Sequence, residues 1–355
     1  AGGPLADRFS ARRLMAAALV ATGLGGAVLA GVPSIPVMNG LWAFWGLTSI
    51  LLFWAAMLRA TREWGGVANQ GRAYGLLDGG RGLLAAVIAS ATVVVFAMLL
   101  PSDASTATPD EIEAAFRAVI WVFTGFTLFV AFLVWVVVPD NAPTSDQGDR
   151  PKLSLKGLQG AFKMPAVWLQ AVIVVCAYVG YKATDDFSLL ARDALGFDDV
   201  AASAIGTLSF WIRAVTAVAA GYLGDRIDSS RVIAWGFGIV IAGSALIASG
   251  WLAPGVAWML IATITATGVG IYALRGVYFA LLAEGAVPLA FTGSAIGVVS
   301  LVGFTPDVFM GPLMGVLLDN SPGVVGHQHV FAVVAAFGVI GLAATIAFRR
   351  VTQRA

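Results

Sequence analysis

The sequence has 355 residues, of which 59% are hydrophobic and only 12% are charged, and its mean hydropathy is +0.87. In an ordinary globular domain about 25% of the residues are charged. The 21 basic and 20 acidic residues are too few to cover the surface of a soluble protein of this length. The net charge of +1 does not indicate nucleic-acid binding, and the single cysteine, Cys176, excludes an internal disulfide and a cysteine metal cluster. The composition therefore predicts an integral membrane protein.

Ten apolar segments are long enough to cross a bilayer as helices, because about 20 residues span its hydrocarbon core. In chain order we expect them at 14–32, 40–58, 73–100, 116–138, 166–186, 200–222, 232–252, 256–280, 291–317 and 330–348. The predicted fold class is thus an all-α membrane protein with ten spans.

Lysine and arginine residues between these spans and at their ends gather on alternate connections, with Arg117 and Arg192 as the exceptions. The positive-inside rule then places the segment around Asp7 and the C-terminus in the cytoplasm, in a multi-pass protein of the cell membrane. The longest polar stretch, 139–163, is expected to be a cytoplasmic linker. It separates an N-terminal bundle, 1–138, from a C-terminal bundle, 164–355.

A short polar motif occurs twice at one constant offset, which indicates an internal repeat. Its first copy contains Gly3, Leu5, Asp7, Arg8 and Arg13, and its second copy contains Gly221, Leu223, Asp225, Arg226 and Arg231. Two predicted spans precede the second copy within its half of the chain, whereas none precedes the first. We therefore expect this chain to lack the first two helices of the repeated unit.

The two copies resemble the cytoplasmic signature Gly-x-Leu-x-Asp-Arg-x-x-x-Arg-Arg of major facilitator superfamily transporters. The resemblance implies two pseudo-symmetric bundles with twelve helices in all, of which this chain would carry helices three to twelve. It also implies a cytoplasmic gate, in which Asp7 faces the start of the eleventh helix near Phe291 and Asp225 faces the start of the fifth near Ala73. A carboxylate at a helix N-terminus is stabilising, which gives the implied gate a physical basis. The alternative is that both copies only anchor basic loops.

Apart from Arg117 at the very start of one span, eight charged side chains fall within the expected spans, where each would cost about 2.5 to 3.5 kcal/mol if it faced lipid. The cations are Arg81, Lys182, Arg213 and Arg275, and the acids are Asp78, Asp185, Asp186 and Asp307. Helical spacing allows Asp78 to pair with Arg81, and Lys182 to pair with Asp185 or Asp186.

Arg213 and Arg275 have no acid within one turn of their own helices, so they are the strongest candidates among the four cations to bind an anionic substrate. The alternative for both is an ion pair with Asp307 or with an acid on another helix. Asp307 follows Pro306 in a span that also contains Pro312, which predicts a broken helix. Its carboxylate would carry a coupling proton or act as counter-ion to Arg275, and Asp185 and Asp186 compete for the proton-carrying role.

His327 and His329 fall in the expected last outer loop, where histidines are most often simply solvated. No metal site is expected from two histidines without a cysteine pair, and no cofactor is expected either. The sequence contains no His-Glu-x-x-His, no Gly-x-Ser-x-Gly and no Gly-Lys-Ser/Thr phosphate loop, so an enzyme is not expected.

The repeat, the motifs and the buried charges together indicate a secondary transporter that works by alternating access, coupled to protons or to exchange. The four cations favour an anion as substrate, and the resemblance is nearest to organic-anion and sugar-phosphate permeases. A nitrate or nitrite carrier is the alternative, and a transporter-like sensor without flux is another. The expected partners are a small anionic solute, protons and the lipid bilayer, with no nucleic acid and with the protein as a monomer.

Overall fold

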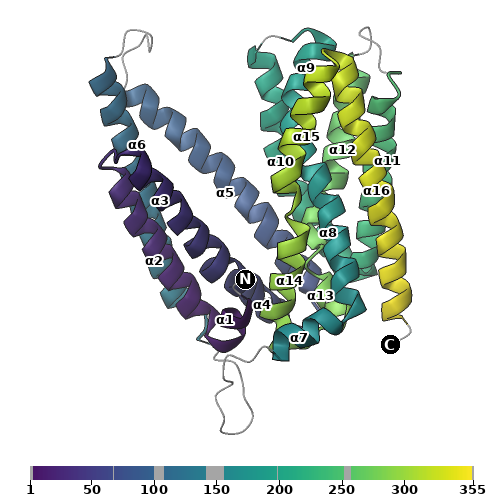
Figure 1. Cartoon of the computed structure of the whole chain (residues 1–355), viewed down its shortest axis with the longest axis horizontal. Coiled ribbons are helices and arrows are strands. Elements are labelled where there is room, and N and C mark those ends of the chain that lie inside the picture. The colour runs from purple at the N-terminus through teal and green to yellow at the C-terminus, as the bar shows by residue number, and fades with distance from the viewer. Residues whose placement is uncertain are drawn as a thin grey trace. The chain divides into compact units, whose positions relative to one another are not determined.

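The computed structural model describes residues 3–66, 68–99, 108–140, 156–197, 199–251 and 257–353. Within these ranges the regular elements are all helical (Figure 1). The chain packs as two units, which we describe separately. The first comprises residues 1–60, 84–160 and 288–297, and the second comprises residues 61–83, 161–287 and 298–355. These packing units differ from the predicted bundles 1–138 and 164–355, which stay a prediction.

The first unit is built around helix α2. It contains α1 (Gly3–Arg8), α2 (Ala11–Leu29), α3 (Ile35–Gly46), the π-helix η1 (Leu47–Trp54), the start of α4 (Ala55–Gly65), residues 84–99 of α5 (Gln70–Leu99), and α6 (Pro109–Val137). Helix α2 packs against α6 and η1, and beside α3 (Figure 1). Gly23 and Gly26 of α2 lie against Leu128 and Thr124 of α6, so small residues allow close helix packing.

Local capping signals define where two helices of this unit begin. The side chain of Ser10 accepts a hydrogen bond from Arg13 N at 3.3 Å and caps α2. Thr108 and Glu111 form a capping box at α6, in which Thr108 N donates to Glu111 Oε2 at 2.9 Å. These hydrogen bonds from Thr108 hold the pKa of Glu111 below its ordinary value.

The second unit contains residues 70–83 of α5 and most of the C-terminal helices. Its elements are α8 (Pro165–Ala183), the short 3-10 helix η3 (Thr184–Asp186), α9 (Phe187–Leu195), α10 (Asp199–Ile227), α11 (Ser229–Ala248), α12 (Ala257–Val277), α13 (Leu281–Glu284), the remainder of α14 (Thr292–Gly303), α15 (Pro306–Asn320) and α16 (Val324–Thr352). The short helices α7 (Lys156–Lys163) and η4 (Leu289–Phe291) complete the described chain.

Helix α16 packs against α8 and α11 in this unit, and α12 packs against α10 and α11 (Figure 1). The core is aromatic and aliphatic: the rings of Phe187 and Phe331 are stacked with centroids 6.0 Å apart. A side chain at Gly341 would collide with the ring of Phe237 and with Cys176. Cys176 is buried and serves packing, in agreement with its position in an apolar run.

All ten predicted spans coincide with helical parts of the structure. By length and composition, eight segments of the described chain are able to cross a membrane, namely Ala11–Leu29, Ile35–Gly65, Glu113–Val137, Pro165–Leu195, Ser229–Ala248, Ala257–Val277, Leu289–Asn320 and Val324–Thr352. The other two predicted spans are the helices α5 and α10. The predicted break in the eleventh span is present, because α14 ends at Gly303 and Pro306 starts α15.

The expectation of an outer loop at His327 is wrong. Helix α16 begins at Val324, directly after Gly323, whose φ of 75° ends the preceding turn. His327 therefore lies within the first turns of α16 and is fully buried, whereas His329 is exposed. Hydropathy placed the start of the helix at residue 330 because His327 is polar. A hydropathy profile does not show that the fold gives this histidine buried hydrogen-bond partners.

Candidate functional site

A buried cluster of charges joins three helices of the second unit. Asp78 of α5 accepts hydrogen bonds from Arg213 of α10, with its two oxygens 2.8 Å from Nη2 and 3.3 Å from Nε. Arg275 of α12 approaches the same carboxylate, with Nη2 at 3.5 Å. The side chains of Asp78, Arg213 and Arg275 are only 9%, 9% and 6% exposed. One carboxylate is thus shared by two buried guanidinium groups.

Arg275 is held by aromatic stacking in addition to this ion pair. Its Cζ lies 3.8 Å from the ring centroid of Tyr181 and 5.5 Å from that of Tyr178, both on α8. Stacking covers the flat face of a guanidinium, but its N–H groups point outward in its plane. The Nε and Nη1 atoms of Arg275 are buried and have no hydrogen-bond partner in the described structure. These two donors are therefore available to an acceptor that is not part of this cluster.

The cluster carries an excess of positive charge. Two guanidinium groups face the single negative charge of Asp78. Arg81, one turn along α5, is exposed and interacts electrostatically with Asp78, Arg213 and Arg275. A buried charge without a counter-ion is costly. The binding of an anion here would be favourable, because the anion would balance the extra positive charge.

The hydrogen bonds of Asp78 reach further than helical spacing suggested. Asp78 interacts electrostatically with Arg81, the expected partner, but the hydrogen bonds described for it come from Arg213 and Arg275 on other helices. Asp307, the other candidate counter-ion of Arg275, instead accepts a hydrogen bond from Tyr178 Oη at 3.1 Å. Both arginines thus face an acid on another helix, as one of the two interpretations expected, and their binding of a substrate stays a prediction.

The remaining acids of the predicted site divide into two environments. Lys182 Nζ lies 3.0 Å from Asp185 and 4.0 Å from Asp307, whose side chains are 62% and 51% exposed. Exposed ion pairs of this kind contribute about 0 to 1 kcal/mol. Asp186, in contrast, is 2% exposed and contacts His327. The pair Lys182–Asp185 agrees with the prediction, whereas Asp186 does not bind Lys182 in the described contacts.

The two motif carboxylates bind helix N-termini. In the first unit, Asp7 accepts hydrogen bonds from Gly293 N at 2.8 Å and Ser294 N at 2.9 Å, at the start of α14. In the second unit, Asp225 accepts from Gly71 N at 2.6 Å and Arg72 N at 3.0 Å, at the start of α5. Both contacts lie where the resemblance implied them. A carboxylate there satisfies orphan N–H groups and the positive end of the helix.

Glycines make these approaches possible. A side chain at Gly71 would collide with the carbonyl of Gly221 and lie 2.8 Å from Asp225 Oδ1. A side chain at Gly293 would collide with the carbonyl of Gly3 and lie 2.7 Å from Asp7 Oδ1. The motif glycines Gly3 and Gly221 are therefore the surfaces against which the capped helices pack.

The basic residues of the motif lie mostly at the surface. Arg8 and Arg226 are exposed, Arg13 binds Asp140 at 3.1 Å, and Arg231 binds Asp228 at 3.2 Å. A hydrogen bond with Ser10, together with Arg13 and Arg12, holds the pKa of Asp140 below its ordinary value. These arginines do not contact the Asp78 cluster in the described structure.

Sequence reasoning did not identify three residues that support the motif regions. Arg59 of α4 donates to the carbonyl of Ala6 in the first unit, and Arg62 donates to the carbonyl of Val287 in the second. Glu284 accepts from Ser230 N at 3.1 and 3.3 Å and so caps α11. Their charge and their place between spans suggested only a basic or polar loop. Their partners are backbone groups, which every residue has, so the sequence carries no signal that identifies these contacts.

Burial affects two of these carboxylates outside the spans. It raises the pKa of Asp7 above its ordinary value, although hydrogen bonds from Ser294 and Gly293 oppose the effect. It also raises the pKa of Glu284, against hydrogen bonds from Ser230. The packing that positions both groups thus withdraws them partly from water.

Comparisons with known proteins agree with this architecture. The family model described as Major Facilitator Superfamily matches residues 1–190. The inner membrane proteins YqcE and YihN of Escherichia coli strain K12 are 25% and 24% identical to the chain, in alignments that cover 98% of it and 82% of each relative.

Among solved structures, the transporter FucP in the outward conformation is similar with a TM-score of 0.72 at 16% identity, covering 96% of this chain and 85% of FucP. A bacterial homologue of the iron transporter ferroportin, in its outward-facing state, has a TM-score of 0.68 at 13% identity, covering 98% of this chain and 86% of that one. These structural likenesses show the fold.

Proposed function

Because the chain belongs to the major facilitator superfamily and is a multi-pass membrane transporter, we propose that it is a secondary transporter of a small organic anion. Arg275 and Arg213 are the principal binding residues, and Arg81 and Lys182 add positive charge nearby. Transport proceeds by alternating access. The protein acts as a monomer with its C-terminus in the cytoplasm and with bundles at 1–138 and 164–355.

The observation that carries this proposal is the state of Arg275. Its side chain is 6% exposed, it shares one carboxylate with Arg213, and its Nε and Nη1 have no hydrogen-bond partner in the described structure. A carboxylate is a strong acceptor for such charged N–H donors and also balances the excess charge. Tyr181 and Tyr178 place aromatic rings beside it, which suits an organic anion better than an inorganic one.

A flux measurement with a defined set of solutes tests the proposal. The purified protein is reconstituted in liposomes and assayed by counterflow for mono- and dicarboxylates, a sugar phosphate, nitrate and a neutral sugar. We expect saturable exchange of at least one organic anion and none of the neutral sugar. Exchange of nitrate alone would assign the site to an inorganic anion, the second candidate, because nitrate is also planar and fits the same donors. Binding without exchange would make the protein a sensor.

The two motif carboxylates are proposed to act as a gate, in which each releases its capped helix N-terminus when the protein changes state. Replacing Asp225 by Asn removes the charge that faces Gly71 N and Arg72 N, so this contact should weaken by about 0.3 to 1 kcal/mol, and by up to about 2 kcal/mol because it is partly buried. That corresponds to a change of two- to thirtyfold in the balance of two states. We expect an altered counterflow rate with normal membrane insertion.

The matched control for the gate is Asp228→Asn, which removes a carboxylate three residues away that pairs with Arg231 at the surface. This variant should exchange substrate at the normal rate. If Asp225→Asn also exchanges at the normal rate, the carboxylate only anchors the loop and has no gating role.

A further inference from the structure

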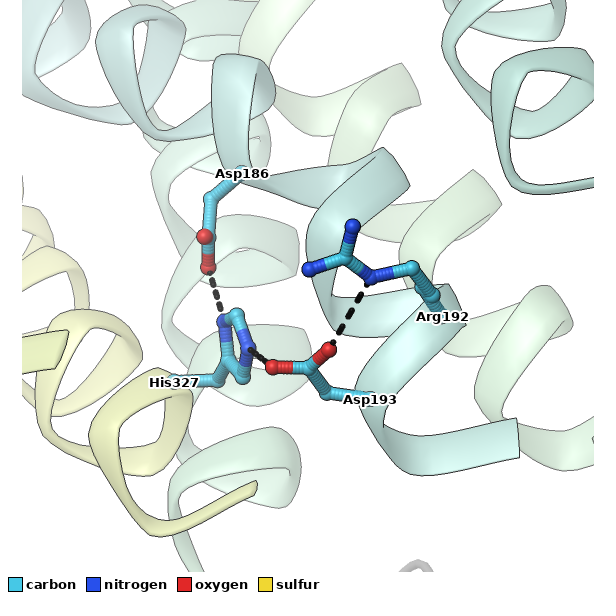
Figure 2. Close-up of polar contacts among 4 residues, drawn as sticks. All are labelled: Asp186, Arg192, Asp193 and His327. Atoms are coloured by element: carbon cyan, nitrogen blue, oxygen red, sulfur yellow. Dashed lines mark hydrogen bonds and ion pairs between the residues drawn. The ribbon is translucent and has the colours of Figure 1, made fainter. Parts of the chain in front are cut away.

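In the second unit, His327 lies between two carboxylates (Figure 2). Its Nδ1 is 2.7 Å from Asp186 Oδ2, and its Nε2 is 3.3 Å from Asp193 Oδ2. The three side chains come from α16, η3 and α9, and the imidazole is 0% exposed. Figure 2 shows that Arg192 approaches the outer side of Asp193, where its Nε lies 3.3 Å from Oδ1.

The number of protons in this arrangement is constrained by its geometry. A neutral imidazole has one N–H donor and one acceptor nitrogen, whereas an ionised carboxylate is only an acceptor. A neutral His327 between two ionised aspartates would therefore direct one lone pair at a carboxylate. An imidazolium donates from both nitrogens and satisfies both contacts. The observed geometry thus requires one proton more than the neutral ring provides.

The charges around His327 also favour one extra proton in this group. The other elements near it contribute Asp186 from η3 and Arg192 and Asp193 from α9. With an imidazolium, these four groups sum to zero charge, and without the extra proton they sum to minus one. Nearby charges that do not enter the count, namely Lys182, Asp185, Asp319 and His329, pair with each other or are exposed.

Exposure falls from one end of this group to the other. The side chains of Arg192 and Asp193 are 50% and 26% exposed, whereas those of His327 and Asp186 are 0% and 1% exposed. The second oxygen of Asp186, Oδ1, is buried without a hydrogen-bond partner in the described structure. A proton that arrives at Asp193 from water therefore has a continuous route to His327.

The site is joined to the Arg275 cluster through helix α8. Asp186 is the last residue of the 3-10 segment η3, which follows α8 directly and joins it to α9. Thr184, at the start of η3, donates a hydrogen bond to the carbonyl of Tyr181 at 2.7 Å. Tyr181 is the ring that stacks on Arg275. Thr184 thus links η3 to the residue that stacks on Arg275.

From this geometry we propose that His327, held between Asp186 and Asp193, binds the proton whose entry and release drive net anion transport. The inference rests on the proposed function, because it assigns the coupling ion of that transporter. In the release step the N–H bond at Nε2 breaks and the proton passes to Asp193 Oδ2. The ring becomes neutral and keeps its Nδ1–H toward Asp186. The protonated Asp193 gives the proton to water in the state that opens to the opposite side of the membrane.

Nitrogen NMR tests proton binding without any transport. The chain has only two histidines, so the variant His329→Gln leaves His327 as the single labelled ring. We expect both ring nitrogens of His327 to carry a proton at pH 7, unlike an ordinary solvated histidine, which is mostly neutral there. A neutral ring with one bare nitrogen at pH 7 and below would overturn the proposal.

Transport in liposomes separates coupling from substrate binding. With the interior one pH unit more alkaline, entry of one proton per monovalent anion concentrates the anion about tenfold at equilibrium. We expect His329→Gln to retain this accumulation. His327→Gln should exchange the anion in counterflow but lose accumulation, so that inner and outer concentrations become equal. Retained accumulation would overturn the proposal, as would loss of counterflow in a stably folded His327→Gln protein.

Asp193→Asn is a second variant that disturbs the site at its exposed end and is less dependent on core packing. It replaces the carboxylate at Nε2 by a neutral amide, which cannot take up the proton, and the same loss of accumulation with intact counterflow is expected. If the wild type exchanges no anion, the proposed function fails, and the NMR result still decides whether His327 binds the proton.

Discussion

Replacing Arg275 by Ala should lower anion exchange about 10- to 100-fold, the largest effect that we expect on transport. The estimate follows from the loss of charge-assisted hydrogen bonds, which contribute about 1.5 to 3 kcal/mol each. Folding should be little affected, because Asp78 keeps Arg213 as its counter-ion at 2.8 Å. Counterflow rates and substrate affinity in liposomes measure the effect.

One further variant separates geometry from charge at position 275, and a second variant elsewhere serves as the control. Arg275→Lys keeps the positive charge but loses the planar fork, so it should fall between the wild type and Arg275→Ala. Arg117→Ala removes an exposed arginine of α6 that pairs with Glu113, and it should exchange normally. If Arg275→Ala matches the control, Arg275 does not bind the transported anion.

Replacing Asp78 by Asn should cause the largest loss of stability. The change leaves Arg213 and Arg275 buried without a negative partner, and breaking a buried ion pair in this way costs about 3 to 5 kcal/mol. The thermal unfolding midpoint of the purified protein in detergent should fall well below that of the wild type. Added anion should raise the midpoint of Asp78→Asn more than that of the wild type, because it replaces the lost charge.

A compensating change distinguishes charge balance from packing in the same cluster. Adding Arg213→Gln to the Asp78→Asn variant removes one of the two uncompensated cations, so the double variant should regain part of the lost stability. An unfolding midpoint for Asp78→Asn equal to that of the wild type would show that this carboxylate is not needed to balance the arginines. A double variant less stable than the single one would assign the effect to packing.

The sequence predicted the helices and the two motif contacts well, because each depends on a local pattern. Long apolar runs predict spans, and a doubled motif predicts equivalent turns even without coordinates. The contacts of Asp7 and Asp225 followed from the resemblance, since each binds backbone N–H groups at a helix start whose position was already expected.

The partners of the buried charges could not be predicted in the same way. Spacing along one helix pointed from Asp78 to Arg81, whereas the described hydrogen bonds join Asp78 to residues 135 and 197 positions away. Any of several distant residues could offset the cost of burying a charged side chain. That cost therefore predicts that a partner exists but not which residue it is. His327 was placed in a loop because hydropathy counts polar side chains as exposed, even where the fold supplies two carboxylates.

The π-helix η1 determines which residues of α4 face the protein. A π-helical turn closes with an i to i+5 hydrogen bond and so holds more chain than an α-helical turn. A residue removed from Leu47–Trp54 therefore comes out of a wide turn, and the helix after it keeps nearly the same face toward its neighbours. Removing one residue from the first turn of α4 instead rotates everything after it by about 100°, and Arg59 and Arg62 would leave the carbonyls of Ala6 and Val287. A change in chain length is thus tolerated within η1 but not between η1 and Arg59.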